Sequence, residues 1–372
     1  MNKAEIKRTI RDLELSIKQI ANKKNKLLFF VADSQGTPIG SLTYTYGIAY
    51  RLKELGYNVQ MLYAEKDFKG VGSWLGEEYA ALPHFNVTKD IVDVAPSDIL
   101  FIPELCSAIM PKAKELHCKR VAILENFNYM TELIPFGASW ESMGIRDCIV
   151  TSKALEKRLL EVFPDIKTYV IHPVINPVLF VGSNEQKKLI VNIVTKDEKN
   201  VNNIFKPFKW RHPEYGFVTF RYISGKSQKE LSELLNEGTI TVWIDPETDF
   251  GYTALEAMAC GNIVIGKIPE NTPEWLVTED GRLRNNGVWF YNTVRELPDI
   301  LADVLNAVLH EGVPEEIYTE AQDVLKNYTQ ELQDADIKEV IEKGILEIRT
   351  KELTLAKSVF KENLEKENKT EE

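Results

Sequence analysis

Apolar residues recur at helical spacing at the start of the chain. They are separated alternately by four and three residues, which predicts a helix over residues 2–24 with one apolar stripe. The stripe consists of Ile6, Ile10, Leu13, Ile17 and Ile20. It either packs on the protein's own surface or forms the seam of a homo-dimer. Three heptads is close to the minimum length for a helical dimer seam.

From residue 26 onward, short apolar runs alternate with helical stretches. Helices are predicted at 42–55, 227–236, 252–260 and 294–310. Gly56 ends the first of these in the usual position after a helix. The predicted strands are LLFFVAD, NVQMLY, DILFIP, RVAIL, DCIVTS, LIVNIVT, GFVTFRYI, TITVWID and NIVIGK. Such alternation implies parallel sheets that are covered on both faces.

The pattern divides the chain into two α/β units of similar size. Residues 1–25 are the N-terminal helix, and 26–172 and 188–312 are two Rossmann-like, doubly wound domains. The segment 173–187 holds two prolines and is predicted to link the domains. Residues 313–372 are predicted to be helices with a charged tail. Ligands of such sheets bind at the carboxyl ends of the strands, so we expect a cleft there.

Composition excludes several classes of protein. The 372 residues are 44% hydrophobic and 27% charged, as in ordinary globular proteins. No apolar run reaches the ~20 residues of a membrane span, and the first residues lack the apolar core of a secretory signal. Four widely spaced cysteines and five scattered histidines predict no metal site and suggest a reducing, cytoplasmic location. The net charge of -11 provides no global basic field for nucleic acid.

The clearest chemical signal is IDPETDFGYTALEAMACGNIVIGK, residues 244–267. A strand ends near Asp245, a loop holds Phe250 and Gly251, and a helix carries Glu256. A glycine at a strand-to-helix turn lets backbone N–H groups approach a phosphate. A carboxylate one turn into the helix can accept hydrogen bonds from both hydroxyls of a ribose. The segment therefore predicts a pocket for a nucleoside diphosphate.

This segment resembles the signature of retaining nucleotide-sugar glycosyltransferases of the GT-B type, approximately P-S-x-x-E-G-F-G-x-x-x-L-E-A-M-A-x-G. The matching positions are Phe250, Gly251, Leu255, Glu256, Ala257, Met258, Ala259 and Gly261. The resemblance implies that Glu256 holds the ribose and that Tyr252 and Thr253 also contact the donor. The family's first glutamate aligns with Thr248. Either neighbouring Asp249 replaces it as a catalytic residue, or the loop presents backbone donors instead.

The same resemblance implies transfer of a hexosyl or pentosyl group from a nucleotide-diphosphate sugar, with retention and without an essential metal or cofactor. Two lysines follow the strand at 189–195, where the family places cations for the diphosphate. Lys199 is the better match and carries a predicted catalytic role, while Lys196 replaces the family's arginine. Lysines in such loops are otherwise simply solvated.

Three further loops are donor-site candidates. Gly36 and Gly40 lie in a glycine-containing loop after the first strand, which an ordinary turn would also explain. Gly225 matches the loop that the family places beside the nucleobase. Glu125 follows the strand RVAIL and either faces the cleft as a catalytic residue or caps the next helix.

The acceptor has two alternatives, a glycan or a hydroxymethylated DNA base modified by a phage-borne enzyme in the host cytoplasm. Lys206, Lys209 and Arg211 alternate with aromatic residues in KPFKWRH, a pattern that can contact nucleic acid or simply form a solvated loop. The alternative to an enzyme is a non-catalytic protein that binds nucleotide sugars or acts as a scaffold. The absence of the first glutamate at Thr248 favours it.

Overall fold

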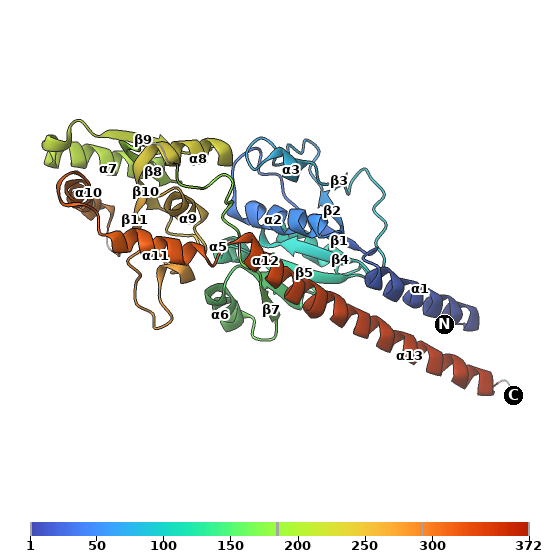
Figure 1. Cartoon of the computed structure of the whole chain (residues 1–372). Coiled ribbons are helices and arrows are strands. Elements are labelled where there is room, and N and C mark those ends of the chain that lie inside the picture. The colour runs from blue at the N-terminus through green and yellow to red at the C-terminus, as the bar shows by residue number, and fades with distance from the viewer. Residues whose placement is uncertain (1, 184–185, 292, 371–372) are drawn as a thin grey trace.

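Parallel strands form two separate sheets in the computed structural model, which describes residues 2–183, 186–291 and 293–370 (Figure 1). The N-terminal sheet has seven strands in the order β3-β2-β1-β4-β5-β6-β7. The C-terminal sheet has five, in the order β12-β11-β10-β8-β9. The predicted class, two doubly wound α/β domains with helical termini, is therefore confirmed.

The strands are short, as in most α/β domains. Those of the first sheet are β1 (Lys26–Phe30), β2 (Asn58–Tyr63), β3 (His84–Asn86), β4 (Ile99–Pro103), β5 (Lys119–Leu124), β6 (Asp147–Val150) and β7 (Lys167–Val170). Those of the second are β8 (Lys188–Thr195), β9 (Thr219–Ile223), β10 (Gly238–Ile244), β11 (Ile263–Lys267) and β12 (Val288–Phe290).

Helices cover both faces of each sheet, and a helical segment ends the chain (Figure 1). In the first part they are α1 (Lys3–Ala21), α2 (Gly40–Glu54), α3 (Glu77–Ala80), α4 (Met110–Ala113), α5 (Phe127–Leu133) and α6 (Lys153–Val162). In the second they are α7 (Glu198–Arg211), α8 (Gln228–Glu237), α9 (Tyr252–Ala259), α10 (Leu297–Asn306), α11 (Glu315–Leu325), α12 (Gln330–Ile337) and α13 (Glu347–Thr370). None of these described helices is long and apolar enough to cross a membrane.

Continuous apolar runs follow from burial on both faces of a sheet. In β1, Leu27 and Phe29 belong to one core cluster, whereas Leu28 and Phe30 belong to the cluster on the opposite face. Successive side chains of a strand point to opposite faces, so a strand covered on both sides must be apolar throughout. The central position of β1, between β2 and β4, places the loop that follows it at the cleft.

The chain passes twice between the domains. The described part of 173–187 contains no helix or strand and joins β7 to β8, while Asn184 and Glu185 lie outside the described residues. After α10, α11 still packs in the C-terminal core through Ala321 and Val324. The segment beyond it then returns to the N-terminal core. The sequence pattern did not predict this division of residues 313–372, of which 371–372 lie outside the described residues.

The N-terminal helix finds its partner within the same chain. α1 begins with a capping box between Asn2 and Glu5 and packs alongside α13, so that the two helices project together from the body (Figure 1). Ile10 and Leu13 of the predicted stripe are buried, and Lys357 and Lys361 lie 3.8 and 3.6 Å from the Glu14 carboxylate. α13 therefore covers the face on which the predicted homo-dimer seam rested.

Candidate active site

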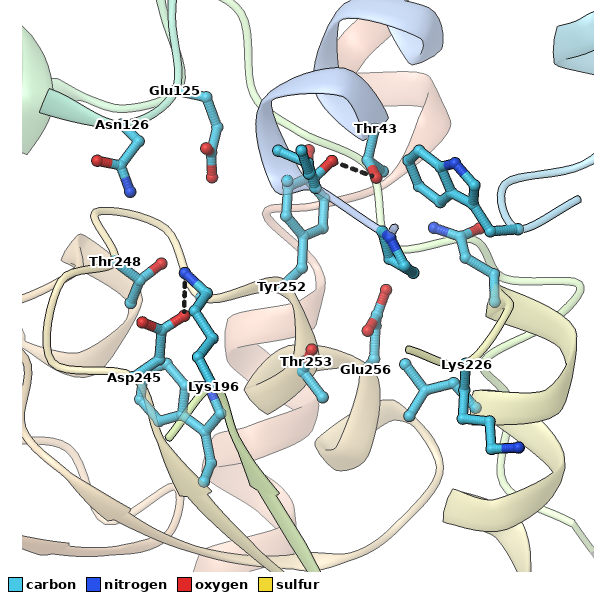
Figure 2. A pocket seen from close by; sticks show the side chains of 18 of the residues that line it. Thr43, Glu125, Asn126, Lys196, Lys226, Asp245, Thr248, Tyr252, Thr253 and Glu256 are labelled. Atoms are coloured by element: carbon cyan, nitrogen blue, oxygen red, sulfur yellow. Dashed lines mark hydrogen bonds and ion pairs between the residues drawn. The ribbon is translucent and has the colours of Figure 1, made fainter. Parts of the chain in front are cut away.

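A cavity of about 170 Å³ lies between the two domains (Figure 2). On the N-terminal side it is lined by the start of α2 and by residues that follow β5. On the C-terminal side it is lined by loops after β8, β9 and β10 and by the first turns of α9. The carboxyl ends of both sheets thus meet at one cavity, as expected for doubly wound domains.

Glu125 points into this cavity from the end of β5 (Figure 2). The cap of α5 comes from Asn126, whose side chain accepts hydrogen bonds from the backbone N–H groups of Asn128 and Tyr129. Asn126, and not Glu125, therefore caps α5, so the capping alternative for Glu125 is wrong. Its burial, and then the charge of Glu104, raise the pKa of the Glu125 carboxyl well above its ordinary value.

Glu104 is a buried carboxyl that the sequence analysis did not single out. It follows β4 and is fully buried, and its Oε1 accepts from the backbone N–H groups of Glu125 and Asn126 at 3.4 and 3.2 Å. Burial raises the pKa of Glu104 to about 7. The sequence feature that could have identified Glu104 is its position directly after the apolar strand DILFIP. In the structure this strand pairs with β5, which ends directly before Glu125. Glu125 in the cavity lining and Glu104 behind it are thus a pair of neighbouring buried carboxyls.

Lys196 supplies positive charge on the opposite wall. Its Nζ lies 3.2 Å from the Asp245 carboxylate (Figure 2). The same Nζ lies 6.0 Å from the centre of the Tyr129 ring. Burial, the largest single effect, lowers the pKa of Lys196, but Asp245, Tyr129 and Glu125 together outweigh it, so the pKa is raised overall. Lys199 lies in the first turn of α7, exposed and outside the cavity lining. The structure thus separates the two lysines that the sequence analysis paired.

The start of α9 forms the floor of the cavity. Gly251 has a left-handed φ of 79°, and a Cβ there would lie 2.7 Å from the Trp243 ring, so glycine is required on both counts. Tyr252, Thr253 and Glu256 line the cavity. Phe250 is buried beside them in the core. Burial raises the pKa of Glu256 to about 8.

Thr248 and Asp249 point to different places. Thr248 lines the cavity, at the position that aligns with the missing glutamate (Figure 2). Asp249 does not line it, and its carboxylate instead accepts from the Phe127 backbone N–H at 2.6 Å and pairs with Arg158 at 2.9 Å. The structure therefore directs Asp249 toward the N-terminal domain and away from the cavity.

The three remaining glycine candidates lie in or beside the cavity. Gly36 has a φ of 83° in the loop before α2 and is outside the lining. Gly40, at the start of α2, lies in the lining, and a Cβ there would come within 2.9 Å of the Glu125 carboxyl. Gly225 has a φ of 62° and lines an adjoining pocket that shares Lys196 with the main cavity.

The basic stretch KPFKWRH is helical and distant from the cavity. It forms the end of α7, on the outer side of the C-terminal domain, with Pro207 inside the helix (Figure 1). Lys209 donates to the Gly216 carbonyl at 3.0 Å, and Arg211 pairs with Asp299. Lys206 is exposed. The stretch is therefore a helix that accommodates Pro207 rather than a solvated loop, although one of its two aromatic residues, Phe208, is buried and Trp210 is exposed.

Among the residues that the structure describes, no group of three or more His, Cys, Asp or Glu side chains is arranged to hold a metal ion. Positive charge at the cavity comes instead from Lys196, and Lys226 also lines it. The cavity therefore combines cationic and hydroxyl groups with buried carboxyls. This set can bind a phosphorylated, hydroxyl-rich ligand.

Comparison with protein-family models finds no match, and comparison with curated proteins finds none either. Solved structures are similar over 86% of the chain. Sucrose-phosphate synthase from Thermosynechococcus elongatus is 11% identical, with a TM-score of 0.63 over 98% of its chain. A TarM variant from S. aureus, in complex with fondaparinux, α-GlcNAc-glycerol and UDP, is 9% identical, with a TM-score of 0.62 over 99% of its chain.

HepE from Anabaena, in complex with UDP-glucose, is 13% identical to the chain and has a TM-score of 0.59, with 86% of this chain and 98% of that chain covered. At such low identity these likenesses show the arrangement of the chain rather than its activity. Nearly the whole length of each relative is matched, so both domains and their relative placement are shared. The protein has the GT-B fold, with two Rossmann-like domains that face each other across a cleft.

Proposed function

We propose that the protein is a glycosyltransferase that moves a sugar from a nucleotide-diphosphate sugar to an acceptor hydroxyl. The observation that carries the proposal is the interdomain cavity, where Lys196, the start of α9 and buried Glu256 face the carboxyl ends of both sheets. The structures of HepE with UDP-glucose and of TarM with UDP, which share the fold, support a nucleotide-sugar donor.

Each lining group has a role in this proposal. Lys196 and the backbone N–H groups at the start of α9, following Gly251, stabilise the charge that develops on the leaving diphosphate. Glu256 holds the ribose hydroxyls, and Thr248 faces the donor sugar. Lys196 takes the role that the sequence analysis favoured for Lys199, because Lys199 lies outside the cavity.

Glu125 is the carboxyl that we propose to face the reacting sugar. Its raised pKa keeps it neutral at a pH where an exposed glutamate is ionised, so it can donate a hydrogen bond to a sugar hydroxyl. The acceptor hydroxyl attacks the anomeric carbon from the face that the diphosphate leaves, as the bond from that carbon to the diphosphate oxygen breaks. The hydroxyl proton passes to this departing oxygen, and attack on the same face retains the configuration. Closure of the cleft excludes water from this step.

The cationic groups of the cavity supply the charge stabilisation that the reaction needs, so we expect it to require no resident metal ion. Transfer should continue at an undiminished rate after treatment with EDTA. Loss of turnover in EDTA that manganese restores would overturn this part of the proposal.

For the acceptor, we propose a glycan or another free sugar hydroxyl. The position of the basic stretch favours it over a DNA base, because Lys209 and Arg211 are engaged within the C-terminal domain and lie away from the cavity. If DNA were the acceptor, replacing Lys206, Lys209 and Arg211 by Ala should lower the salt slope of duplex binding by about two to three units. Binding of hydroxymethylated duplex at low salt would revive the DNA alternative.

The test of the proposed function starts with a panel of nucleotide sugars screened for protection against thermal unfolding. A donor at ~100 times its dissociation constant should add ~2.7 kcal/mol of stability. The selected donor is then incubated with the protein, and release of free nucleotide diphosphate is measured. Binding without any release would instead support the scaffold alternative.

Two lysine variants sharpen this test. Lys196→Ala should lower the rate of donor turnover more than it raises the KM for the donor, since charge develops as the diphosphate leaves. Lys199→Ala removes an identical charge three residues away, outside the cavity, and should behave as wild type. Equal loss in both variants would place the diphosphate elsewhere.

A further inference from the structure

Beside the cavity, the loop after β10 is fastened to the start of α5 in the other domain. The side-chain amides of Asn126 and Asn128 both donate to the Glu247 carbonyl, at 3.1 and 3.0 Å. The Phe127 backbone N–H donates to Asp249 Oδ2 at 2.6 Å. Three consecutive residues of one domain thus bind a three-residue stretch of the other.

Arg158 of α6 completes this contact. Its Nη1 lies 2.9 Å from Asp249 Oδ1, and its guanidinium carbon lies 3.9 Å from the centre of the Phe127 ring. Both carboxylate oxygens of Asp249 are therefore bonded to the N-terminal domain. The Asp249 side chain is only 4% exposed, so neither water nor salt competes effectively for it.

Other interdomain contacts lie elsewhere on the cleft. The Gln228 backbone N–H donates to the Trp74 carbonyl at 2.8 Å, and the Lys153 backbone N–H donates to the Glu274 carboxylate at 3.0 Å. These contacts do not involve Asp249, so they survive its replacement. The Glu247 carbonyl also keeps its bonds from Asn126 and Asn128, so losing the Asp249 contact should loosen this side of the cleft without separating the domains.

We propose that Asp249, Arg158 and the start of α5 form an interdomain clamp that holds the cleft closed and makes Asp249 a positioning residue for Thr248. Thr248 precedes Asp249 and lines the cavity, where Figure 2 shows it opposite Glu125 and Asn126. The clamp fixes the backbone immediately after Thr248 to the domain that carries Glu125. It thereby sets the separation between the two walls of the cavity.

The clamp is tested by measuring the distance between the domains in the ligand-free protein. Spin labels are attached at Lys53→Cys on α2 and Asn203→Cys on α7, two exposed positions in different domains. The four native cysteines are buried, so the labels go to the introduced thiols. Asp249→Asn and Arg158→Gln are each expected to shift the double electron–electron resonance distance to longer values and to broaden its distribution.

Glu247→Gln is the matched control. It removes a carboxylate from the same loop, but the Glu247 side chain is exposed and its bonded group is the backbone carbonyl, which the substitution preserves. Its distance distribution should match that of the parent protein. If Asp249→Asn fails to fold, Arg158→Gln tests the same pair from the other domain. Distributions that coincide with the control for the folded clamp variants would overturn the proposal.

A kinetic measurement tests the positioning role and rests on the proposed function. In donor hydrolysis, Asp249→Asn should raise the donor KM at least five-fold with a smaller change in kcat. The reason is that a smaller fraction of the molecules then has the closed cleft that binds the donor. An unchanged KM alongside an altered distance would keep the clamp and overturn the positioning role. The distance measurement needs no turnover, so failure of the proposed function is distinguishable from failure of the clamp.

Discussion

At the residue scale, Gly40 and Glu125 depend on each other. The Gly40 φ lies outside the left-handed region, so an alanine could adopt this backbone. A Cβ would nevertheless lie 2.9 Å from Glu125 Oε1. An alanine at this position would therefore require the Glu125 carboxyl to move, whereas no turn requires a glycine here. The sequence analysis selected Gly40 as a donor-site candidate in the loop after the first strand, whereas it opens α2.

We predict that Gly40→Ala destabilises the wild-type protein by roughly 1–3 kcal/mol, the usual cost of overpacking. In an Glu125→Ala background the same change should be nearly neutral, since the obstructing carboxyl is gone. Gly47→Ala is the control, because a Cβ there meets nothing within 4 Å and α2 should gain about 1 kcal/mol. Urea unfolding of the variants measures these effects, and an equal cost of Gly40→Ala in both backgrounds would contradict the prediction.

Glu256 should make stability depend on pH. Its pKa of about 8 lies above the ordinary value of 4.5, so the fold favours the protonated carboxyl. The stabilising contribution is complete below pH 4.5 and is lost as the pH rises through about 8. Relative to Glu256→Gln, the wild type should therefore lose more than ~1.4 kcal/mol, the equivalent of one pKa unit, across this interval.

Urea unfolding at pH 5 and pH 8.5 measures this difference. Exposed Glu233→Gln serves as a control that should show no comparable trend. A stability difference between wild type and Glu256→Gln that is independent of pH would show that the carboxyl is already ionised in the ligand-free fold.

The limits of sequence reasoning are clearest at Thr248 and Asp249. The register of the motif located both residues at the end of β10, but adjacent side chains can face opposite ways. Only the partners in the other domain, Phe127 and Arg158, decide that Asp249 turns away from the cavity. Those partners lie about a hundred residues earlier in the chain, and no local pattern encodes the contact.

At the element scale, the strands that the pattern missed lie at the edges of the sheets. β3, β7 and β12 are short, and each is the outermost strand on its side. Central strands are covered on both faces and form long apolar runs, which makes them visible in the sequence. Edge strands bury less apolar surface and carry polar residues, as the sequence KTYV of β7 shows.

The pairing of α1 with α13 leads to a prediction about one helix face. Leu13 is 8% exposed and belongs to the core, whereas Leu15 of the same helix is 57% exposed. Leu13→Ala should cost about 2–5 kcal/mol, and Leu15→Ala should stay within about 0.5 kcal/mol of wild type. Urea unfolding measures both variants.

The oligomeric state of these variants separates the two interpretations of the α1 stripe. Sedimentation of wild type and Leu13→Ala should give the same mass if α13 alone covers the stripe. A mass that falls from dimer to monomer in Leu13→Ala would restore the homo-dimer seam predicted from the sequence.

At the scale of the whole molecule, the order of the chain does not follow the division into domains. β1 to β7 precede residue 173, and the C-terminal sheet and α11 come next, but the final helices return to the N-terminal core. Ile341 and Ile345 are fully buried there against the first sheet's helices and strands. Amphipathic periodicity predicted that residues 313–372 are helical, but such a pattern does not specify which domain a helix covers.

This return crossing predicts that two positions of the C-terminal segment stabilise different domains. Ile341 is buried in the N-terminal core and Val324 in the C-terminal core. Ile341→Ala should cost about 2–5 kcal/mol and speed amide hydrogen exchange in β1 and α2, although these lie some three hundred residues earlier. Val324→Ala should speed exchange in β10 and α9 instead. Peptide-resolved exchange of the two variants makes the comparison, and equal acceleration in both domains would show that they unfold as one cooperative unit.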